Sequence, residues 1–435
     1  MTKIGIRRED ISKWERRTPL VPEHIKNIIN ESGIEVVVQP SDTRVFTAKQ
    51  FEEVGAIVSE DLSECSVIFA VKEIPSNLFI EKTAYLFFAH VIKGQKYNMG
   101  MLQKMIDKKC TLIDYEKIID DAGRRLIFFG KFAGNAGMID SLSAYSQRLD
   151  IEKIPNPLNK IKKTLEYENL IEAEKAIYNV GREISEKGLP IEICPLVIGF
   201  AGYGNVSKGA QEICNCLPII EISPEELLEL RKSGRVDRYH IYKVVFKEKD
   251  MVTPKNSNDK FELQDYYDNP HKYNGDFHKY IDHINILINC IYWEEKYPRL
   301  LTKAYTKKIF SGDKQPELKV IGDISCDIGG AIECTMKATK PDKPNYTYLV
   351  DEDIIVDGIE GKGPVIMAVT NLPCEIPAES STAFSSTLFE FVPEITSADY
   401  EGEFKDLKLS KSIKDAVILF KGEFTENYKY IKKFL

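Results

Sequence analysis

At residues 195–209 the chain reads Pro195-Leu-Val-Ile-Gly-Phe-Ala-Gly202-Tyr-Gly204-Asn-Val-Ser207-Lys-Gly209. An apolar run, closely spaced glycines and a following helical pattern are typical of the turn that binds the pyrophosphate of a dinucleotide. Backbone N–H groups approach the phosphates there, and the positive end of the helix dipole adds to the attraction. Gly202 and Gly204 stand at the glycine positions, and Ser207 takes the third small position. A purely structural turn is the alternative, but the strand and helix context favours a dinucleotide site.

The composition bounds the class of protein. A chain of 435 residues exceeds the size at which a single core stops growing, so we expect two or three domains. The net charge of −8, without a basic stripe, argues against a nucleic-acid partner. No apolar run approaches the roughly 20 residues of a membrane span, so we expect no membrane partner.

Cysteine usage and the N-terminus suggest a compartment. The nine cysteines include no CxxC pair, so we expect reduced thiols and no metal site. The N-terminal residues carry acids and enter a strand at once, and no presequence is visible. These features predict a cytoplasmic protein, with the mitochondrial matrix as the alternative.

Apolar runs alternate with helical patterns along the chain. Strands are predicted at residues 3–6, 35–38, 67–71, 84–89, 111–113, 284–291 and 318–324. Helices are predicted at residues 23–30, 96–108, 384–391 and from Leu170 to the Gly188 stop. This rhythm predicts an α/β fold of two Rossmann-like, doubly wound parallel-sheet domains with a cleft between them.

The domain ranges follow from the same pattern. Residues 1–137 are expected to form a substrate or catalytic domain that residues 334–435 complete. Residues 138–194 are expected to form a helical linker, and residues 195–333 the dinucleotide-binding Rossmann domain. A polar, aromatic segment at residues 249–282 is expected to be a surface insertion.

Two titratable side chains follow neighbouring apolar runs in the first half. Lys72 comes after the run that ends at Val71, and His90 after the run that ends at Ala89. Open parallel sheets bind ligands at the carboxyl ends of their strands, so both groups are expected in one crevice. Burial would lower the lysine pKa toward neutrality, which suits an acid/base pair. A solvated lysine and a core histidine are the alternative, but the parallel placement favours the pair.

Several segments along the chain resemble segments of one protein family and stand in the same order as in that family. These segments are Trp14-Glu-Arg-Arg17-Thr-Pro-Leu, Val71-Lys72-Glu73, Phe88-Ala-His90-Val-Ile-Lys-Gly-Gln95, Leu112-Ile-Asp-Tyr-Glu116-Lys, Gly130-Lys-Phe-Ala-Gly134-Asn-Ala-Gly137-Met, Gly202-Tyr-Gly204-Asn-Val, Asn289-Cys-Ile-Tyr-Trp293-Glu, Asp323-Ile-Ser-Cys-Asp327 and Asn371-Leu-Pro373. The chain resembles the lysine–ketoglutarate reductase part of the bifunctional aminoadipic semialdehyde synthases. It is more distantly similar to the fungal lysine-forming saccharopine dehydrogenases and to the alanine dehydrogenase/transhydrogenase superfamily.

The resemblance implies a reaction and its partners. It implies an oxidoreductase that condenses L-lysine with 2-oxoglutarate and reduces the imine with NADPH to saccharopine. We expect no fused saccharopine-cleaving domain after Leu435, so a separate dehydrogenase would take that step. A homo-oligomer is a further expectation. The alternatives are an NAD-dependent saccharopine dehydrogenase working in the lysine-forming direction, an alanine-dehydrogenase-like enzyme, and a non-catalytic metabolite sensor.

The resemblance also implies roles for individual residues. The implied catalytic residues are Lys72, His90, Glu116 and Asp327. The implied substrate-binding residues are Arg17, Glu73, Gln95 and Arg125. The predicted cofactor-binding residues are Gly202, Gly204, Asn205, Val206, Ser207, Ser223, Asn289 and Asp323. Structural alternatives are an ion pair of Arg17 with Glu15 or Glu23, a solvated Glu116, and a turn-forming Asp327.

The choice of coenzyme depends on one strand end. NAD enzymes usually place an acid at the end of the second strand, about 20 residues after the glycines. Residues 218–223 offer Ser223 at the end and Glu221 within the strand. With Ser223 at the end nothing repels a 2′-phosphate, whereas a shift of register by two residues makes Glu221 select NAD. The cations within reach of a phosphate are Arg231, Lys232 and Arg235. We favour NADPH as cofactor, with NADH as the alternative.

Overall fold

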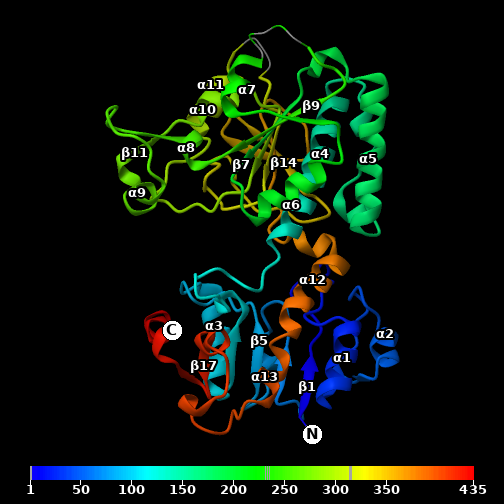
Figure 1. Ribbon diagram of the computed structural model, residues 1–435, viewed down its shortest axis with the longest axis vertical. Coiled ribbons are helices and arrows are strands. Elements are labelled where there is room, and N and C mark those ends of the chain that lie inside the picture. Colours follow the sequence, from blue (N-terminus) through cyan, green and yellow to red (C-terminus); the bar gives the residue numbers. More distant parts are fainter. Residues whose placement is uncertain (1, 231, 233, 235, 313–315) are drawn as a thin grey trace. The chain divides into compact units, whose positions relative to one another are not determined.

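The computed structural model describes residues 2–230, 232, 234, 236–312 and 316–435. These residues form two compact units (Figure 1). Unit 1 comprises residues 1–129 and 377–435, and unit 2 comprises residues 130–376. Each unit contains its own eight-stranded sheet covered by helices, which confirms the predicted α/β class.

Unit 1 has the strand order β3-β2-β1-β4-β5-β6-β17-β18. Its strands are β1 (Lys3–Ile6), β2 (Glu35–Val38), β3 (Ile57–Val58), β4 (Val67–Phe69), β5 (Ala84–Phe87), β6 (Thr111–Asp114), β17 (Val417–Phe420) and β18 (Glu423–Phe424). The first six are parallel, and β17 and β18 are antiparallel. Its helices are α1 (Pro22–Ser32), α2 (Ala48–Glu53), α3 (Lys96–Asp107), α12 (Pro377–Phe389), α13 (Val392–Ser397) and α14 (Lys411–Asp415).

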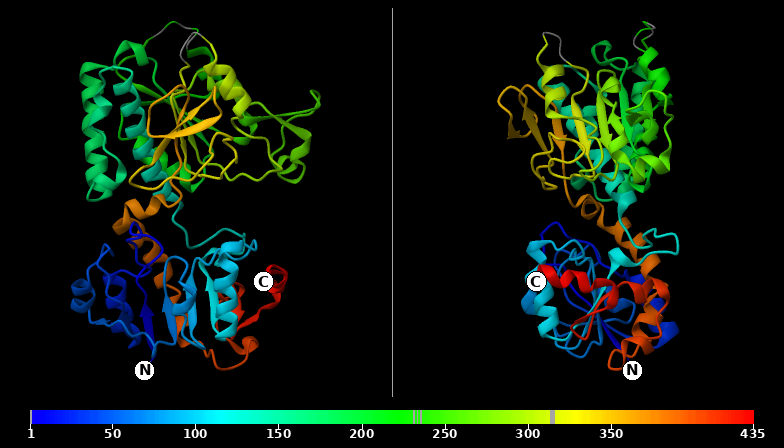
Figure 2. Two further views of the ribbon diagram at one scale, coloured as in Figure 1. Left: turned by 180° about the vertical axis from the view of Figure 1, so that it is seen from behind. Right: turned by 90° about the vertical axis from the view of Figure 1, so that its left-hand side faces the viewer.

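Alternation along these strands builds two cores, one on each face of the sheet. Phe69 and Leu86 pack with the residues of α1 and α12, whereas Ile68 and Tyr85 pack with the residues of α3. Successive side chains of a strand point to opposite faces, so a strand buried on both faces is apolar throughout. The C-terminal 3₁₀ segment η9 (Glu426–Phe434) lies beside α3 in both views of Figure 2 and adds to that second core.

Unit 2 has the strand order β8-β9-β7-β12-β13-β16-β14-β15. Its strands are β7 (Val197–Ala201), β8 (Ile219–Glu221), β9 (Ile241–Phe246), β12 (Ile286–Asn289), β13 (Val320–Asp323), β14 (Asn345–Leu349), β15 (Ile354–Asp357) and β16 (Val365–Met367). Its helices are α4 (Gly130–Ile151), α5 (Leu170–Lys187), α6 (Asn205–Cys214), α7 (Pro224–Leu230), α8 (Glu248–Met251), α9 (Leu263–Asp268), α10 (His278–Ile281) and α11 (Lys303–Phe310). A separate hairpin joins β10 (Val252–Pro254) and β11 (Tyr273–Gly275).

Short 3₁₀ turns complete both units. They are η1 (Ser76–Leu78), η2 (Tyr115–Lys117), η3 (Pro157–Lys160), η4 (Thr164–Glu166), η5 (Ile191–Ile193), η6 (Pro270–Lys272), η7 (Leu372–Glu375) and η8 (Phe404–Asp406). All seven strands predicted from the sequence are present, but the prediction missed β3, β9–β11 and β14–β18. The sheets are also not wholly parallel, because β14 and β15 close the second sheet in antiparallel pairing as β17 and β18 close the first.

The two units divide the chain differently from the predicted domain ranges. The segment expected as a linker belongs to unit 2, where α4 packs against α6 and β13. Residues 334–376 also belong to unit 2, because β16 pairs in parallel with β13 and β14 pairs with β16. Only residues 377–435 return to unit 1.

Helices α4 and α6 cross at two glycines. A Cβ atom at Gly209 would lie 1.9 Å from the carbonyl oxygen of Lys131, and one at Gly134 would lie 2.0 Å from that of Val206. The Asn135 amide donates to the Gly209 carbonyl at 3.1 Å, which ties the helices together. Larger side chains would push the backbones apart, so these glycines set the position of α6 directly after the glycine-rich turn.

Candidate functional site

In unit 1, three predicted residues gather at the carboxyl ends of parallel strands. Lys72 and Glu73 follow β4, and His90 follows β5. Glu73 Oε1 lies 2.6 Å from His90 Nδ1. His90 has a φ of +46°, a conformation that side chains with a Cβ adopt at a cost. The structure therefore brings the predicted acid/base pair and its acidic neighbour into one cluster.

The charge of Lys72 is set by its surroundings. Burial lowers its pKa, and the positive charge of Arg17 lowers it further, while Glu73 and Glu15 oppose the shift. Burial raises the pKa of Glu73, but the hydrogen bond and charge of His90, a backbone hydrogen bond and the charge of Lys72 together outweigh burial, and the pKa lies below its ordinary value. An amine with a lowered pKa beside an ionised acid is suited to proton transfer.

Glu9, which the sequence analysis missed, holds the Lys72 segment in place. Its carboxylate accepts from the backbone N–H of Val71 at 2.7 Å and from that of Lys72 at 2.9 Å. Burial raises its pKa to about 7, although these two bonds act in the opposite direction. Glu9 lies in a polar loop after β1, where no motif marked it.

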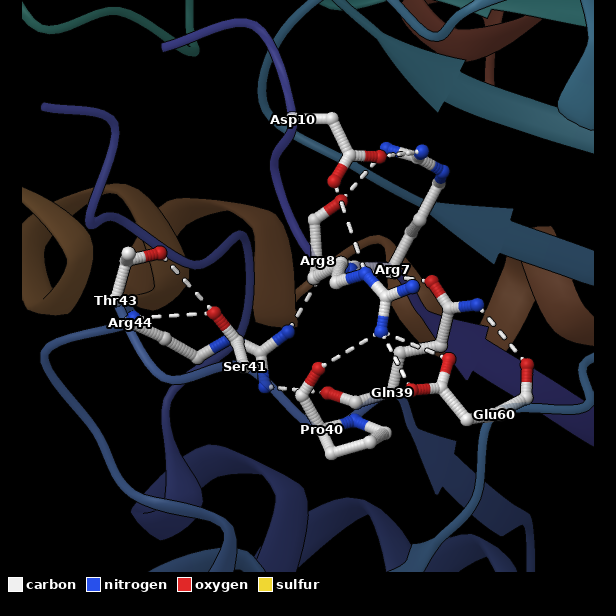
Figure 3. A network of polar contacts seen from close by, with 9 residues as sticks. All are labelled: Arg7, Arg8, Asp10, Gln39, Pro40, Ser41, Thr43, Arg44 and Glu60. Atoms are coloured by element: carbon white, nitrogen blue, oxygen red, sulfur yellow. Dashed lines mark hydrogen bonds and ion pairs between the residues drawn. The ribbon is translucent and has the colours of Figure 1, made fainter. Parts of the chain in front are cut away.

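That loop belongs to an arginine-rich network, drawn in Figure 3. Arg8 donates to both carboxylate oxygens of Glu60, at 2.7 and 2.8 Å, and Arg44 donates to the carbonyls of Gln39 and Arg7, at 2.9 and 3.3 Å. The network ties the ends of β1 and β2 to the segment after β3. It borders a cavity of about 460 Å³ whose wall also includes Glu9.

Arg17 is buried, with only 2 % of its surface exposed. Its Nε and one Nη donate to the two carboxylate oxygens of Glu15, at 2.7 and 2.6 Å. Its guanidinium also lies over the ring of Phe129, 4.1 Å from the ring centroid. The ion pair with Glu15 considered from the sequence is therefore present, in the interior and next to Lys72 rather than at the surface.

Glu116 and Arg125 form an ion pair with each other. The Glu116 N–H also donates to buried Asp114 at the end of β6. Burial raises the pKa of Asp114 to about 7, and the charge of Glu116 adds to that shift while His90 opposes it. Gln95 stands at the start of α3 and accepts from the Lys93 N–H at 3.0 Å.

In unit 2, the glycine-rich turn connects β7 to α6. Gly202 has a φ of +94°, which favours glycine, and the space around a Cβ at Gly204 is open. No side chain caps the first turn of α6, which begins at Asn205. Ser207 is fully buried, so the third small position serves close packing. The turn and helix start fit a pyrophosphate, with Asn205 and Val206 in the first helical turn.

A cavity of about 470 Å³ adjoins this turn. Its walls are largely aromatic, and the lining residues are Gly202, Tyr203, Gly204, Glu248, Met251, Tyr266, Tyr267, Cys290, Ile291, Tyr292, Trp293 and Tyr297. Met251, Tyr266 and Tyr267 come from the segment expected to be a surface insertion, which therefore forms one wall. A mostly apolar cavity with few polar groups fits a nucleoside.

Asn289 and Asp323 end the adjacent strands β12 and β13 and are buried. Asn289 donates to Asp323 Oδ1 at 2.8 Å, and the Cys326 N–H donates to the same oxygen at 3.1 Å. The Thr335 hydroxyl donates to Oδ2. Asp323 thus holds both ends of the loop that carries the exposed Asp327.

The residues predicted to choose the coenzyme lie away from the glycine turn. Strand β8 is the sheet edge, and β9 separates it from β7. Ser223 accepts from the Glu226 N–H at 3.1 Å at the start of α7, and Glu221 pairs with Lys243 at 2.8 Å. Lys232 pairs with Glu229 at 2.8 Å, whereas Arg231 and Arg235 lie outside the described residues.

The described residues contain neither a membrane-crossing helix nor a cluster of metal ligands. No helix among them combines the length and apolarity that a membrane crossing needs. Within the same residues, no group of three or more His, Cys, Asp or Glu side chains is arranged to hold a metal ion.

The chain belongs to the alanine dehydrogenase/PNT family. The N-terminal domain of that family matches residues 5–136, and its C-terminal domain matches residues 237–427. The L-alanine dehydrogenase structure has the same fold, with a TM-score of 0.64 and 14 % identity over 100 % of this chain and 99 % of its own.

Curated relatives give a closer likeness. The alpha-aminoadipic semialdehyde synthase of Arabidopsis thaliana is 38 % identical over 99 % of this chain and 41 % of its own length. The mitochondrial alpha-aminoadipic semialdehyde synthase of Bos taurus is 37 % identical over 99 % of this chain and 47 % of its own length. This chain therefore spans less than half the length of these relatives.

Proposed function

We propose that the protein condenses L-lysine with 2-oxoglutarate and reduces the resulting imine to saccharopine with a reduced nicotinamide coenzyme. The observation that carries the proposal is the cluster of Lys72, Glu73 and His90 beside buried Arg17 at the strand ends of unit 1. The similarity to the aminoadipic semialdehyde synthases over 99 % of the chain supports the choice of substrates.

The chemistry requires proton transfers of two kinds. The lysine amine must lose a proton to attack the oxo carbon, and the carbinolamine oxygen must gain one before water leaves. A lysine with a lowered pKa and an imidazole held by Glu73 supply a base and an acid of different type. The bound coenzyme supplies the hydride that reduces the imine carbon. Asp327, on its loop in unit 2, is assigned to the region of the nicotinamide.

Carboxylate recognition falls to the arginines of unit 1. The product carries three carboxylates, and a guanidinium binds a carboxylate through two parallel hydrogen bonds. Arg17 lies among Lys72 and Glu15, and Arg125 is half exposed beside Glu116. We assign substrate binding to these two arginines with Gln95.

A reaction series tests the proposal. Coenzyme oxidation is followed at constant 2-oxoglutarate with lysine, ornithine, ammonia or no amine, and with pyruvate plus ammonia. Turnover is expected only when lysine and 2-oxoglutarate are both present, with saccharopine identified by mass. Equal turnover with ammonia and pyruvate would instead support an alanine-dehydrogenase-like enzyme, and no turnover with any pair would favour a metabolite sensor.

The physiological direction of the reaction, the enzyme that follows it and its cellular compartment stay predictions. Saccharopine oxidation to lysine is the same chemistry reversed, and initial rates in both directions compare the two. A separate dehydrogenase, or another part of a longer chain, would then cleave saccharopine. Cytoplasm or mitochondrial matrix remains the predicted location. The expectation of NADPH depended on Ser223, and that support is weakened because Ser223 follows the edge strand β8, which does not neighbour β7.

A further inference from the structure

The strand order of unit 2 changes which residue lies beside the glycine turn. In a dinucleotide-binding sheet the acid that binds the adenosine ribose follows the strand next to the one that leads into the glycines. Here that neighbour is β9, which pairs with β7 along its whole length from Val197↔Tyr242 to Ala201↔Phe246. Glu248 comes two residues after the end of β9.

Glu248 lies in the wall of the 470 Å³ cavity together with Gly202 and Gly204. Its carboxylate accepts from the Tyr267 hydroxyl at 2.7 Å and also interacts with the hydroxyl of Tyr203. The two tyrosines hold the Glu248 carboxylate beside the glycine-rich turn. Among the described residues that line the cavity, Glu248 is the only one of the Asp, Glu, Lys and Arg types.

We infer that Glu248 binds the ribose hydroxyls of the adenosine half and makes the protein prefer NADH to NADPH. This inference rests on the proposed function, whose coenzyme it names. A carboxylate accepts hydrogen bonds from the 2′- and 3′-hydroxyls of NADH. The 2′-phosphate of NADPH would bring two negative charges against the same carboxylate, which disfavours it.

The nearby cations do not reverse this assignment. Lys247 is exposed, and its amine lies over the ring of Tyr203, 5.8 Å from the ring centroid. Lys249 is exposed as well. Neither lysine is among the residues that line the cavity, whereas Glu248 is.

A direct binding assay measures the preference between NADH and NADPH without any turnover of substrate. The chain has two tryptophans, Trp14 and Trp293, and Trp293 lines the cavity. Energy transfer from tryptophan to the reduced nicotinamide therefore reports binding of NADH and of NADPH in separate titrations. The wild-type protein is expected to bind NADH about tenfold or more tightly than NADPH.

Three variants test whether Glu248 causes the preference for NADH. Glu248→Gln should weaken NADH, strengthen NADPH and remove most of the preference. Glu225→Gln, an exposed acid on α7, is the matched control and should leave both affinities unchanged. Lys247→Met tests whether that lysine binds a phosphate, and it should change the two affinities equally. Circular dichroism and thermal unfolding confirm that each variant is folded.

Each outcome decides the inference. A wild-type preference for NADPH, an unchanged ratio in folded Glu248→Gln, or a selective loss of NADPH in Lys247→Met would overturn it, as would binding of neither coenzyme. An NADH preference that depends on Glu248, without turnover of lysine and 2-oxoglutarate, would sustain the inference and reject the proposed function. The binding and turnover experiments thus fail separately.

Discussion

The Glu73 carboxylate lies 2.6 Å from Nδ1 of His90, and the same carboxylate carries a charge that acts on Lys72. Three residues from the ends of two neighbouring strands therefore form one electrostatically coupled cluster. Neither strand alone brings these residues together. The cluster forms because β4 and β5 pair in parallel from Val67↔Ala84 to Phe69↔Leu86.

Removing either member of the acid/base pair should lower catalysis and leave coenzyme binding intact. Lys72→Met and His90→Gln are each expected to lower kcat by about 10²- to 10⁴-fold, because each removes a proton-transfer group. The glycine turn lies in unit 2, so the Kd for reduced coenzyme should change less than about threefold. Steady-state kinetics and tryptophan energy transfer measure the two effects. If kcat stays within about threefold of wild type in both variants, the catalytic assignment is wrong.

Arg17 is expected to bind a substrate carboxylate while its charge also balances Glu15. Replacing it by alanine would leave buried Glu15 without its ion-pair partner, at a cost of about 3–5 kcal/mol. Arg17→Lys keeps the charge but loses the planar fork. We expect Arg17→Lys to raise KM for 2-oxoglutarate about tenfold and to leave KM for lysine within about threefold. An unchanged KM for both substrates in a folded variant would restrict Arg17 to a structural role.

Replacement by alanine should affect different properties at two glycines near the start of α6: stability at Gly209 and coenzyme binding at Gly204. Gly209→Ala should lower stability by about 2 kcal/mol or more, because its Cβ would meet the Lys131 carbonyl at 1.9 Å. Gly204→Ala has open space for its Cβ and should unfold at the wild-type temperature. It should nevertheless weaken coenzyme binding about tenfold or more, because the methyl group would keep the pyrophosphate from the backbone. Thermal unfolding measures the stability of both variants, and coenzyme titration measures their affinity. If both variants lost stability, or if both kept wild-type affinity, the prediction would be wrong.

A buried acid pair should make stability depend on pH. Asp140 on α4 and Glu375 in η7 are both buried, and the negative charge of Asp140 acts on Glu375. Burial raises the pKa of Asp140 to about 6 and raises the pKa of Glu375 well above its usual range. The folded state therefore binds protons more tightly than the unfolded state, so stability is full below about pH 4 for this pair and falls as pH rises through about 6 and beyond.

The variant Asp140→Asn tests this linkage. Asparagine retains an oxygen that accepts from the Thr164 N–H, which now bonds Asp140 at 2.8 Å, and its amide can donate to Glu375. The decline of unfolding temperature between pH 5 and 8 should be shallower in Asp140→Asn than in wild type. Asp150→Asn, at the exposed end of the same helix, is the control and should retain the wild-type slope. Equal slopes in all three proteins would contradict the assignment.

Local patterns in the sequence determined much of the fold and half of the candidate site. Apolar runs predicted the central parallel strands β1, β4, β5, β6, β12 and β13, because parallel strands buried on two faces must be apolar throughout. The turn at Gly202 was recognisable because a positive φ and a close backbone approach both require glycine. Lys72 and His90 were recognisable because each directly follows a buried strand, and the carboxyl ends of parallel strands share one edge.

Only the tertiary structure decided which groups meet. Arg17 and Glu15 are two residues apart, yet the sequence did not show that they pair in the interior rather than in solvent. Strand β9 lies between β8 and β7, and this order is the reason why we propose Glu248 rather than Ser223 as the residue that chooses the coenzyme. β9 buries most of its six residues, whereas the three residues of β8 are at best half-buried. Competition for a central place in a sheet depends on burial against distant strands and helices, and no local pattern encodes it.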